Sequence, residues 1–431
     1  MAPRSRTLAI LLAKALGAVA SCNALVGAPD PIAASGDADA SDSSLYESGA
    51  RPGDATAGAS DAGREATEAD TTISDGGGEA CCPGGCTGLT SDWRNCGACG
   101  HSCQFANCSN SVCEPVTIAG SVTDNRDLFA LYGLTLLNGQ LYGTNWYRSY
   151  AAVYTVSPNV SVSDPTPLVT YEAGVSASPI VNDGTRLFYV MFRDEMIPIP
   201  GAAAGIYALD TSGKQSLVVR AAGVGTIAAD DNYLYWTLGH TVSVAQKDGA
   251  GAVAFSTGTT YLSRIAAGSG WNWVYFIQDG ALVRATPPHL DTVTSVSGSD
   301  HNVAAFALDA TNVYWVDGPG DAQPSRLFSV PVSAPSEPAM DITPEAGLPA
   351  APYTFNLLAD PTSANLFYLA NDAFLAKIYR LKKDGSQDPV LLLTENDGII
   401  AWTQDDTRLF FTTYGNNSPG PPFAAIWKVE K

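Results

Sequence analysis

Ile227-Ala-Ala-Asp-Asp-Asn-Tyr-Leu-Tyr-Trp-Thr237 and Phe306-Ala-Leu-Asp-Ala-Thr-Asn-Val-Tyr-Trp-Val316 share one pattern. A short apolar run leads into a turn of Asp, Asn or Thr, and a second run follows that carries an aromatic pair. Turn residues between two apolar runs predict two antiparallel strands joined by a tight turn. The two stretches are therefore predicted to be copies of one β-structured repeat.

Five weaker copies occur elsewhere, beginning at Leu136, Ile180, Ile265, Leu358 and Ala401. The first aromatic residues of the seven copies are spaced by 46, 47, 40, 39, 53 and 43 residues; they are Tyr142, Phe188, Tyr235, Tyr275, Tyr314, Phe367 and Phe410. This period suits the four-stranded blade of a β-propeller. The sequence predicts an all-β, seven-bladed propeller.

Closure of the ring can be predicted from the two ends of the repeat region. Ile426-Trp-Lys-Val-Glu430 matches the third strand of a unit, whereas Pro115-Val-Thr-Ile-Ala119 matches a fourth strand with no unit before it. We expect the early strand to complete the last blade (velcro closure), which removes an open sheet edge.

The Tyr-Trp pairs resemble the YWTD repeats of six-bladed receptor propellers. They are more similar to the propeller repeats of secreted proteins from myxobacteria. The resemblance covers about 315 residues. It implies the fold and says little about activity, because propellers serve many functions.

Residues 1–21 are predicted to be a signal peptide. Arg4 and Arg6 precede an apolar run from Leu8 to Ala20, which is interrupted by Lys14 and too short to span a bilayer. Val19-Ala-Ser-Cys22 resembles the lipobox of bacterial lipoproteins, although Lys14 departs from that pattern, and the resemblance implies lipidation of Cys22. The alternative is ordinary cleavage after Ala20, which leaves Cys22 unmodified.

Residues 22–80 are predicted to be a disordered tether rich in Ala, Gly, Ser and Asp. From residue 23 to residue 80, twelve acidic residues stand against two arginines, a net charge of −10. No hydrophobic periodicity is present, so this segment cannot bury enough surface to offset its chain entropy.

Residues 81–113 are predicted to form a small disulfide-rich module, because an exported segment this short cannot build an adequate core. The pairing cannot be deduced from sequence. The competing interpretation is zinc binding by Cys96-Gly-Ala-Cys99 with His101 nearby, but we predict no metal. The run from Asn95 to Cys103 resembles cysteine-rich modules of secreted myxobacterial proteins. The predicted disulfide cysteines are Cys81, Cys82, Cys86, Cys96, Cys99, Cys103, Cys108 and Cys113.

Charge excludes some partners of the chain. The net charge is −20 overall and −13 over the predicted propeller, residues 114–431. Such a protein has no electrostatic footprint for nucleic acid or anionic lipid. We expect no nucleic-acid partner, and membrane contact only through the lipid anchor.

The propeller holds few residues of catalytic type. Its histidines are His240, His289 and His301, and the common hydrolase, zinc and phosphate-loop motifs do not occur. We predict no catalytic residues and no cofactor. The repeated aromatics are predicted to pack between blades, and the turn carboxylates are predicted to cap turns rather than bind calcium; these are Asp230, Asp231, Asp309 and Asp406.

Loop lengths predict one elaborated face. With antiparallel strands, the loops between second and third strands share a face with the inter-blade connections; we call it the loop face. The first-to-second turns lie on the opposite side, the turn face. The long connections are Gly143–Ala152, Met191–Gly205, Val316–Ser325, Ala370–Lys377, Thr412–Ala425 and Ser333–Tyr353.

Tyr, Trp, Arg and Asn in these loops are residue types typical of recognition surfaces. The predicted binding residues are Trp146, Tyr147, Arg148, Tyr150, Phe192, Arg193, Tyr414, Asn416 and Asn417. We predict a monomeric, non-catalytic binding module of the cell envelope that recognises a protein or a glycan. The alternatives are an exported propeller enzyme, such as a lyase or lactonase, and a structural spacer.

Overall fold

A computed structural model describes residues 79–82, 85–88, 107–109, 112–120, 131–145, 149–159, 165–193, 203–256, 262, 264–268, 270, 272–318, 325–335, 337–349, 354–372, 375–395, 398–413 and 425–431. By contacts the chain divides into Met1–Gly77 and Gly78–Lys431. Among the described residues no helix could cross a membrane. The predicted lipidation site Cys22 and residues 22–78 of the predicted tether lie outside them.

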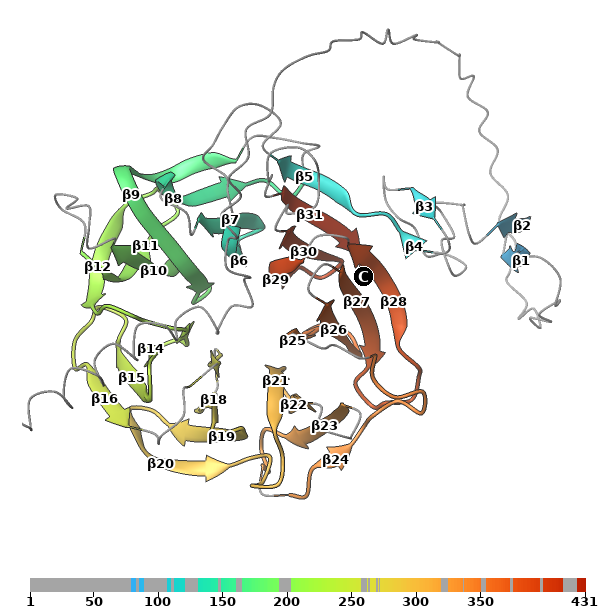
Figure 1. Ribbon diagram of the computed structural model, residues 1–431. Coiled ribbons are helices and arrows are strands. Elements are labelled where there is room, and N and C mark those ends of the chain that lie inside the picture. The colour runs from blue at the N-terminus through green and yellow to red at the C-terminus, as the bar shows by residue number, and fades with distance from the viewer. Residues whose placement is uncertain are drawn as a thin grey trace, which may run out of the picture. The chain divides into compact units, whose positions relative to one another are not determined.

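The described residues form an all-β propeller of seven blades, as the repeat predicted (Figure 1). Blades 1 and 2 share one continuous sheet, made of β6 (Leu131–Leu137), β7 (Gln140–Asn145), β8 (Ser149–Val156), β9 (Thr166–Asn182), β10 (Leu187–Arg193), β11 (Gly205–Leu209) and β12 (Gln215–Arg220). The long β9 is both the fourth strand of blade 1 and the first strand of blade 2.

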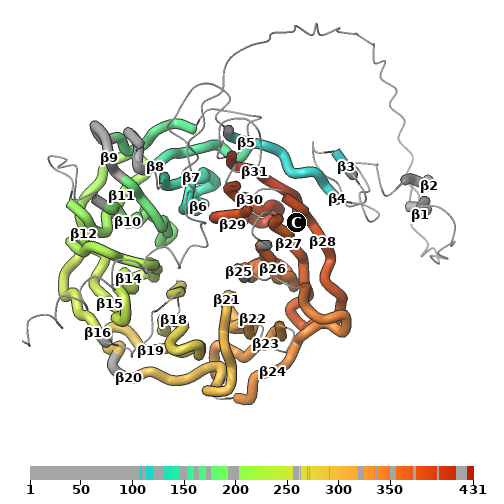
Figure 2. Tube along the Cα trace, in the orientation of Figure 1, coloured from blue at the N-terminus to red at the C-terminus, as the bar shows by residue number. Residues whose placement is uncertain are grey.

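Blades 3 to 6 are separate four-stranded antiparallel sheets. Blade 3 consists of β13 (Ile227–Ala229), β14 (Tyr233–Leu238), β15 (Thr241–Gln246) and β16 (Val253–Ser256), and blade 4 of β17 (Ile265–Ala266), β18 (Val274–Gln278), β19 (Ala281–Thr286) and β20 (His289–Ser295). Blade 5 consists of β21 (Val303–Leu308), β22 (Asn312–Asp317), β23 (Arg326–Pro331) and β24 (Met340–Asp341), and blade 6 of β25 (Thr354–Ala359), β26 (Asn365–Asp372), β27 (Leu375–Lys382) and β28 (Val390–Glu395). Figure 2 shows the trace passing through these blades in chain order.

Blade 7 closes the ring with strands from two distant parts of the chain. Its first three strands are β29 (Ile399–Gln404), β30 (Arg408–Thr413) and β31 (Ala425–Glu430), and its fourth is β5 (Val116–Gly120). In Figure 1 the cyan β5 lies beside the red β31, and Ile426 pairs with Ala119 in their ladder. The predicted velcro closure is confirmed.

Two small hairpins precede β5. One joins β1 (Glu79–Cys82) to β2 (Gly85–Gly88), with Cys81 and Cys86 as Cα partners. The other joins β3 (Cys108–Ser109) to β4 (Val112–Cys113), and both Cys108 and Cys113 are disulfide-bonded. Cys96, Cys99 and Cys103 lie outside the described residues, so the eight-cysteine module stays a prediction.

The apolar core is divided into clusters, one at each seam between neighbouring blades. Each repeated aromatic lies on the second strand of its blade, is at most 5% exposed and belongs to one of these clusters. Tyr142, for example, packs at the seam of blades 1 and 2, and Phe410 at the seam of blades 7 and 1. The predicted role in packing between blades is confirmed.

Candidate functional site

The turn face uses its charged residues within the fold. In five blades an aspartate at the start of the first turn accepts hydrogen bonds through Oδ1 from backbone N–H groups of that turn; these are Asp183, Asp230, Asp309, Asp360 and Asp405. The structural roles predicted for Asp230 and Asp309 are therefore confirmed.

Two other predicted turn caps are wrong. Asp405, not Asp406, caps the turn of blade 7, because the carboxylate at the first turn position reaches the N–H groups two and three residues on. Asp406 is exposed. Asp231 instead accepts a hydrogen bond from the backbone N–H of Gly270 in blade 4, at 3.0 Å.

Three of the turn aspartates also receive a lysine from the following blade. Each lysine directly follows the third strand of that blade, and the N–O distances are 2.6 Å for Lys247–Asp183, 2.7 Å for Lys383–Asp309 and 3.0 Å for Lys431–Asp360. Burial raises the pKa of each aspartate, but the lysine, hydroxyl and backbone donors outweigh it and hold each pKa at about 2. These carboxylates are committed to holding blades together.

The loop face differs in how its polar groups are paired. The second strands end there in polar residues that are buried or half-buried, among them Thr144, Thr237, Gln278, Asp317, Asn371 and Thr413. Buried side-chain oxygens of Thr144, Asp317 and Asn371 have no hydrogen-bond partner among the described residues. Native folds rarely leave buried polar atoms unpaired, so these oxygens mark positions that water or a ligand would satisfy.

His301 and Asp317 form a close pair at the loop-face end of blade 5. Nδ1 of His301 lies 2.5 Å from Oδ2 of Asp317, and both side chains are largely buried. The imidazole packs edge-on against Phe328, with ring centroids 4.7 Å apart, and against Trp315 at 5.8 Å. The carboxylate and the two aromatic rings hold the imidazole in one orientation.

Arg264 and Asn356 meet across the centre of the ring. The arginine Nη1 donates to Oδ1 of Asn356 at 2.9 Å, and the two residues belong to blades 4 and 6, which are not neighbours. Both lie toward the loop-face ends of the innermost strands. Burial lowers the pKa of Arg264 to about 10, which leaves the side chain cationic at neutral pH. A cationic side chain is therefore buried near the inner strands of an acidic protein.

Most of the predicted binding residues lie outside the described residues: Trp146, Tyr147, Arg148, Tyr414, Asn416 and Asn417. Tyr150 lies in β8 and Arg193 in β10. Phe192, also in β10, is half-buried and packs against the cluster at the seam of blades 2 and 3. Their part in binding stays a prediction.

Two predicted long loops are shorter in the structure. β26 and β27 continue until only residues 373 and 374 separate them, and β7 and β8 until only 146–148 remain. Polar residues at these strand ends are typical of loops, but here they continue the strands: Asp372 and Leu375 still pair in the ladder. The longer second-to-third loops are 194–204, 318–325 and 414–424, in blades 2, 5 and 7.

The three histidines do not converge. His240 lies at the β14–β15 turn on the loop face of blade 3, and the exposed His289 begins β20 on the turn face of blade 4. Among the described residues no group of three or more His, Cys, Asp or Glu could hold a metal ion. The pairs His301–Asp317 and Arg264–Asn356 were not predicted; only the position of Asp317, directly after Tyr314-Trp-Val316, offered a signal.

No protein-family model and no curated protein matches the chain. Solved propellers do match. A catalytically inactive virginiamycin B lyase from Staphylococcus aureus, solved with quinupristin, has 12% identity and a TM-score of 0.52 over 74% of this chain and 98% of that chain. The Dos1 propeller has 8% identity and a TM-score of 0.47, with 73% of this chain and 94% of that chain covered. A nidogen/laminin complex has 13% identity and a TM-score of 0.39, with 60% of this chain and 92% of that chain covered. At these identities the lyase structure supports the fold alone.

Proposed function

We propose that this chain is a non-catalytic binding module whose loop face holds a protein or glycan partner. The contrast between the two faces carries the proposal. At the turn face, five aspartates cap their turns and three of them also bind a lysine from the next blade, whereas the loop face bears the longer loops and the buried oxygens of Thr144, Asp317 and Asn371 that lack partners among the described residues. Polar groups that the fold leaves without a hydrogen-bond partner are available to bind a partner molecule.

The setting that we propose is the cell envelope. A signal peptide, lipidation at Cys22 and an acidic tether would export the propeller and hold it away from the membrane. The sequence of residues 1–80 supports this part of the proposal.

Replacing Trp146, Tyr147 and Arg148 together with alanine is expected to lower partner capture by tenfold or more. Aromatic and arginine anchors each contribute about 2 kcal/mol or more at interface hot spots. The measurement is affinity capture from envelope extracts and on a glycan array, with the full-length protein as bait. A binding role predicts that the melting temperature shifts by less than about 2 °C, because side chains that contact only the partner do not stabilise the fold.

The matched control is Asp406→Ala, an exposed change on the turn face, and it should capture as well as the parent. Equal capture by the triple variant and the control would contradict binding through the loop face. A large fall in melting temperature of the triple variant would assign those residues a structural role instead.

An exported enzyme is the second candidate, and the His301–Asp317 pair favours it, since a carboxylate that orients an imidazole is common to many acid-base catalysts. Quinupristin, the compound in the lyase structure, is a suitable probe. For a lyase, the parent should consume quinupristin and His301→Ala should not, as followed by mass spectrometry. Absence of turnover by the parent would contradict a quinupristin lyase.

A further inference from the structure

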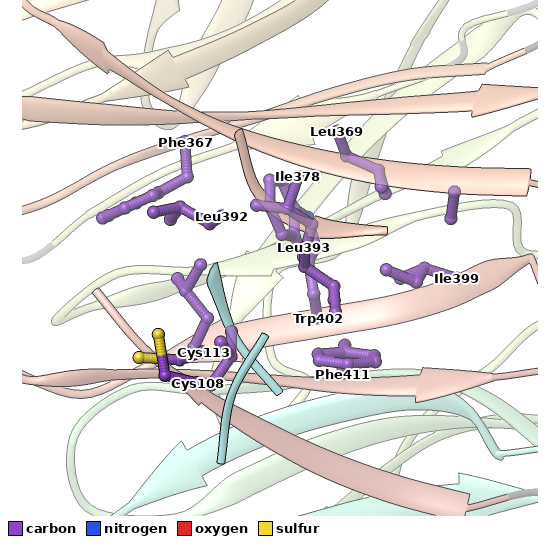
Figure 3. Packing of buried hydrophobic residues seen from close by; sticks show 13 residues of the cluster. Cys108, Cys113, Phe367, Leu369, Ile378, Leu392, Leu393, Ile399, Trp402 and Phe411 are labelled. Carbon is purple, nitrogen blue, oxygen red and sulfur yellow. The ribbon is translucent and has the colours of Figure 1, made fainter. Parts of the chain in front are cut away.

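The β3–β4 hairpin is seated in the core of the propeller. Cys108 and Cys113 are 8% and 3% exposed and belong to the cluster at the seam of blades 6 and 7. Figure 3 shows both side chains in this cluster, which also contains Phe367, Leu392 and Leu393. β4 contacts β28, the outer strand of blade 6. The hairpin thus covers apolar surface that water would otherwise reach.

So short a hairpin cannot persist by its own hydrogen bonds. Each strand has two residues, and even longer isolated hairpins are marginal in water. Asn107 and Glu114 add a backbone hydrogen bond of 2.8 Å and a side-chain hydrogen bond of 3.0 Å, but both residues are exposed. Disulfide bonding at Cys108 and Cys113 is therefore the covalent constraint on the hairpin, beside the packing of the two side chains in the seam.

The hairpin is joined to the strand that closes the ring. Only Glu114 and Pro115 separate Cys113 from β5. β5 is the outer strand of blade 7 and is hydrogen-bonded in its sheet to β31 alone. The segment from β3 to β5 is therefore held at two places. The hairpin contacts β28 of blade 6, and β5 pairs with β31 of blade 7.

We propose that the hairpin is a disulfide-dependent clasp, and that stable closure of the propeller requires oxidised Cys108 and Cys113. Reduction converts each disulfide into two thiols, with two electrons and two protons supplied by two thiols of the reductant, which become a disulfide. The hairpin then loses its constraint and leaves the seam. β5 then keeps its ladder with β31 and the packing of Ile118 at the seam of blades 7 and 1 but loses its second attachment, on blade 6, so stable closure depends on an oxidising compartment.

The test is hydrogen exchange of the full-length Cys108→Ala/Cys113→Ala variant, read by mass spectrometry in β5 and β31. Exchange there should rise about tenfold or more, because the ladder opens more often, while β14 and β22 exchange as in the parent. Cys81→Ala/Cys86→Ala is the matched control: it also removes two cysteines that face each other in a hairpin, and β5 should exchange as in the parent.

Wild-type protein folded under oxidising conditions, then reduced with dithiothreitol and alkylated, provides the same readout should the double variant not fold. Cys108 and Cys113 should be alkylated as β5 exchange rises. Unchanged exchange in β5 after their alkylation overturns the clasp. An equal rise in the Cys81→Ala/Cys86→Ala control also overturns it, because the effect would then not depend on this hairpin.

Discussion

Replacing Lys383 with methionine is expected to lower the free energy of unfolding by about 3 kcal/mol or more at neutral pH. Removing one partner of a buried ion pair leaves the other charge uncompensated. Lys383 Nζ lies 2.7 Å from Oδ2 of Asp309 in blade 5 and 2.6 Å from the carbonyl oxygen of Asp360 in its own blade. The Asp309 side chain is only 6% exposed, so water cannot replace the lysine.

This loss should depend on pH in a defined direction. Burial raises the pKa of Asp309, but the hydrogen bond from Lys383 and those from Thr311 and Asn312 lower it from 3.8 to about 2. A carboxylate with a lowered pKa stabilises the fold above pH 3.8, and that contribution disappears as the pH falls toward 2. The gap between parent and variant should therefore narrow between about pH 4 and pH 2 in urea unfolding.

Lys382→Met is the control, because the neighbouring Lys382 donates to the neutral amide oxygen of Asn365, at 3.1 Å. It should cost about 1 kcal/mol or less. Adding Asp309→Asn to Lys383→Met should restore part of the loss, since no buried charge remains. A loss for Lys383→Met that is the same at every pH would contradict the ion-pair interpretation.

Replacing Ile118 with aspartate is expected to open the ring. Ile118 is fully buried in β5 and packs at the seam of blades 7 and 1, beside Leu131 and Phe410. An unpaired carboxylate in this cluster costs about 4 kcal/mol or more. Detachment of β5 avoids that cost but exposes the edge of β31, so the variant should melt earlier and form larger species on size exclusion.

Ile118→Val keeps the site apolar and should cost only about 1 kcal/mol. Thr117→Asp places the same charge one residue away, at a half-buried position. The ring-closure role would be refuted by an Ile118→Asp variant that melts and elutes like Thr117→Asp.

The sequence predicted the blades because packing between them repeats. Every seam needs an aromatic residue from a second strand, so Tyr235 and Tyr314 recur with the period of the fold. The sequence also predicted closure of the ring, because Pro115–Ala119 matches a fourth strand that has no preceding repeat, while the last repeat ends after its third strand. Loop length was predicted poorly, since Asn371 and Asp372 look like loop residues but remain paired in the β26–β27 ladder.

The candidate site was harder to predict because its contacts have no period. Arg264 and Asn356 are 92 positions apart and meet only because seven blades return the chain to a common axis. His301 lies in an inter-blade connection and pairs with Asp317, and next to this pair the backbone N–H of Gly318 donates to the carbonyl oxygen of Asn302 at 2.7 Å. Ring geometry, rather than local pattern, creates both pairs.

The shared strand β9 has a mechanical consequence. Its first part, residues 166–175, pairs with β8 and its last part, residues 175–182, pairs with β10, so tension applied to blade 1 passes along one continuous strand into blade 2. Blades 3 to 6 are separate sheets and can detach singly under load. A propeller pulled by its ends should therefore lose those four blades in separate, shorter steps and blades 1 and 2 together in one longer step.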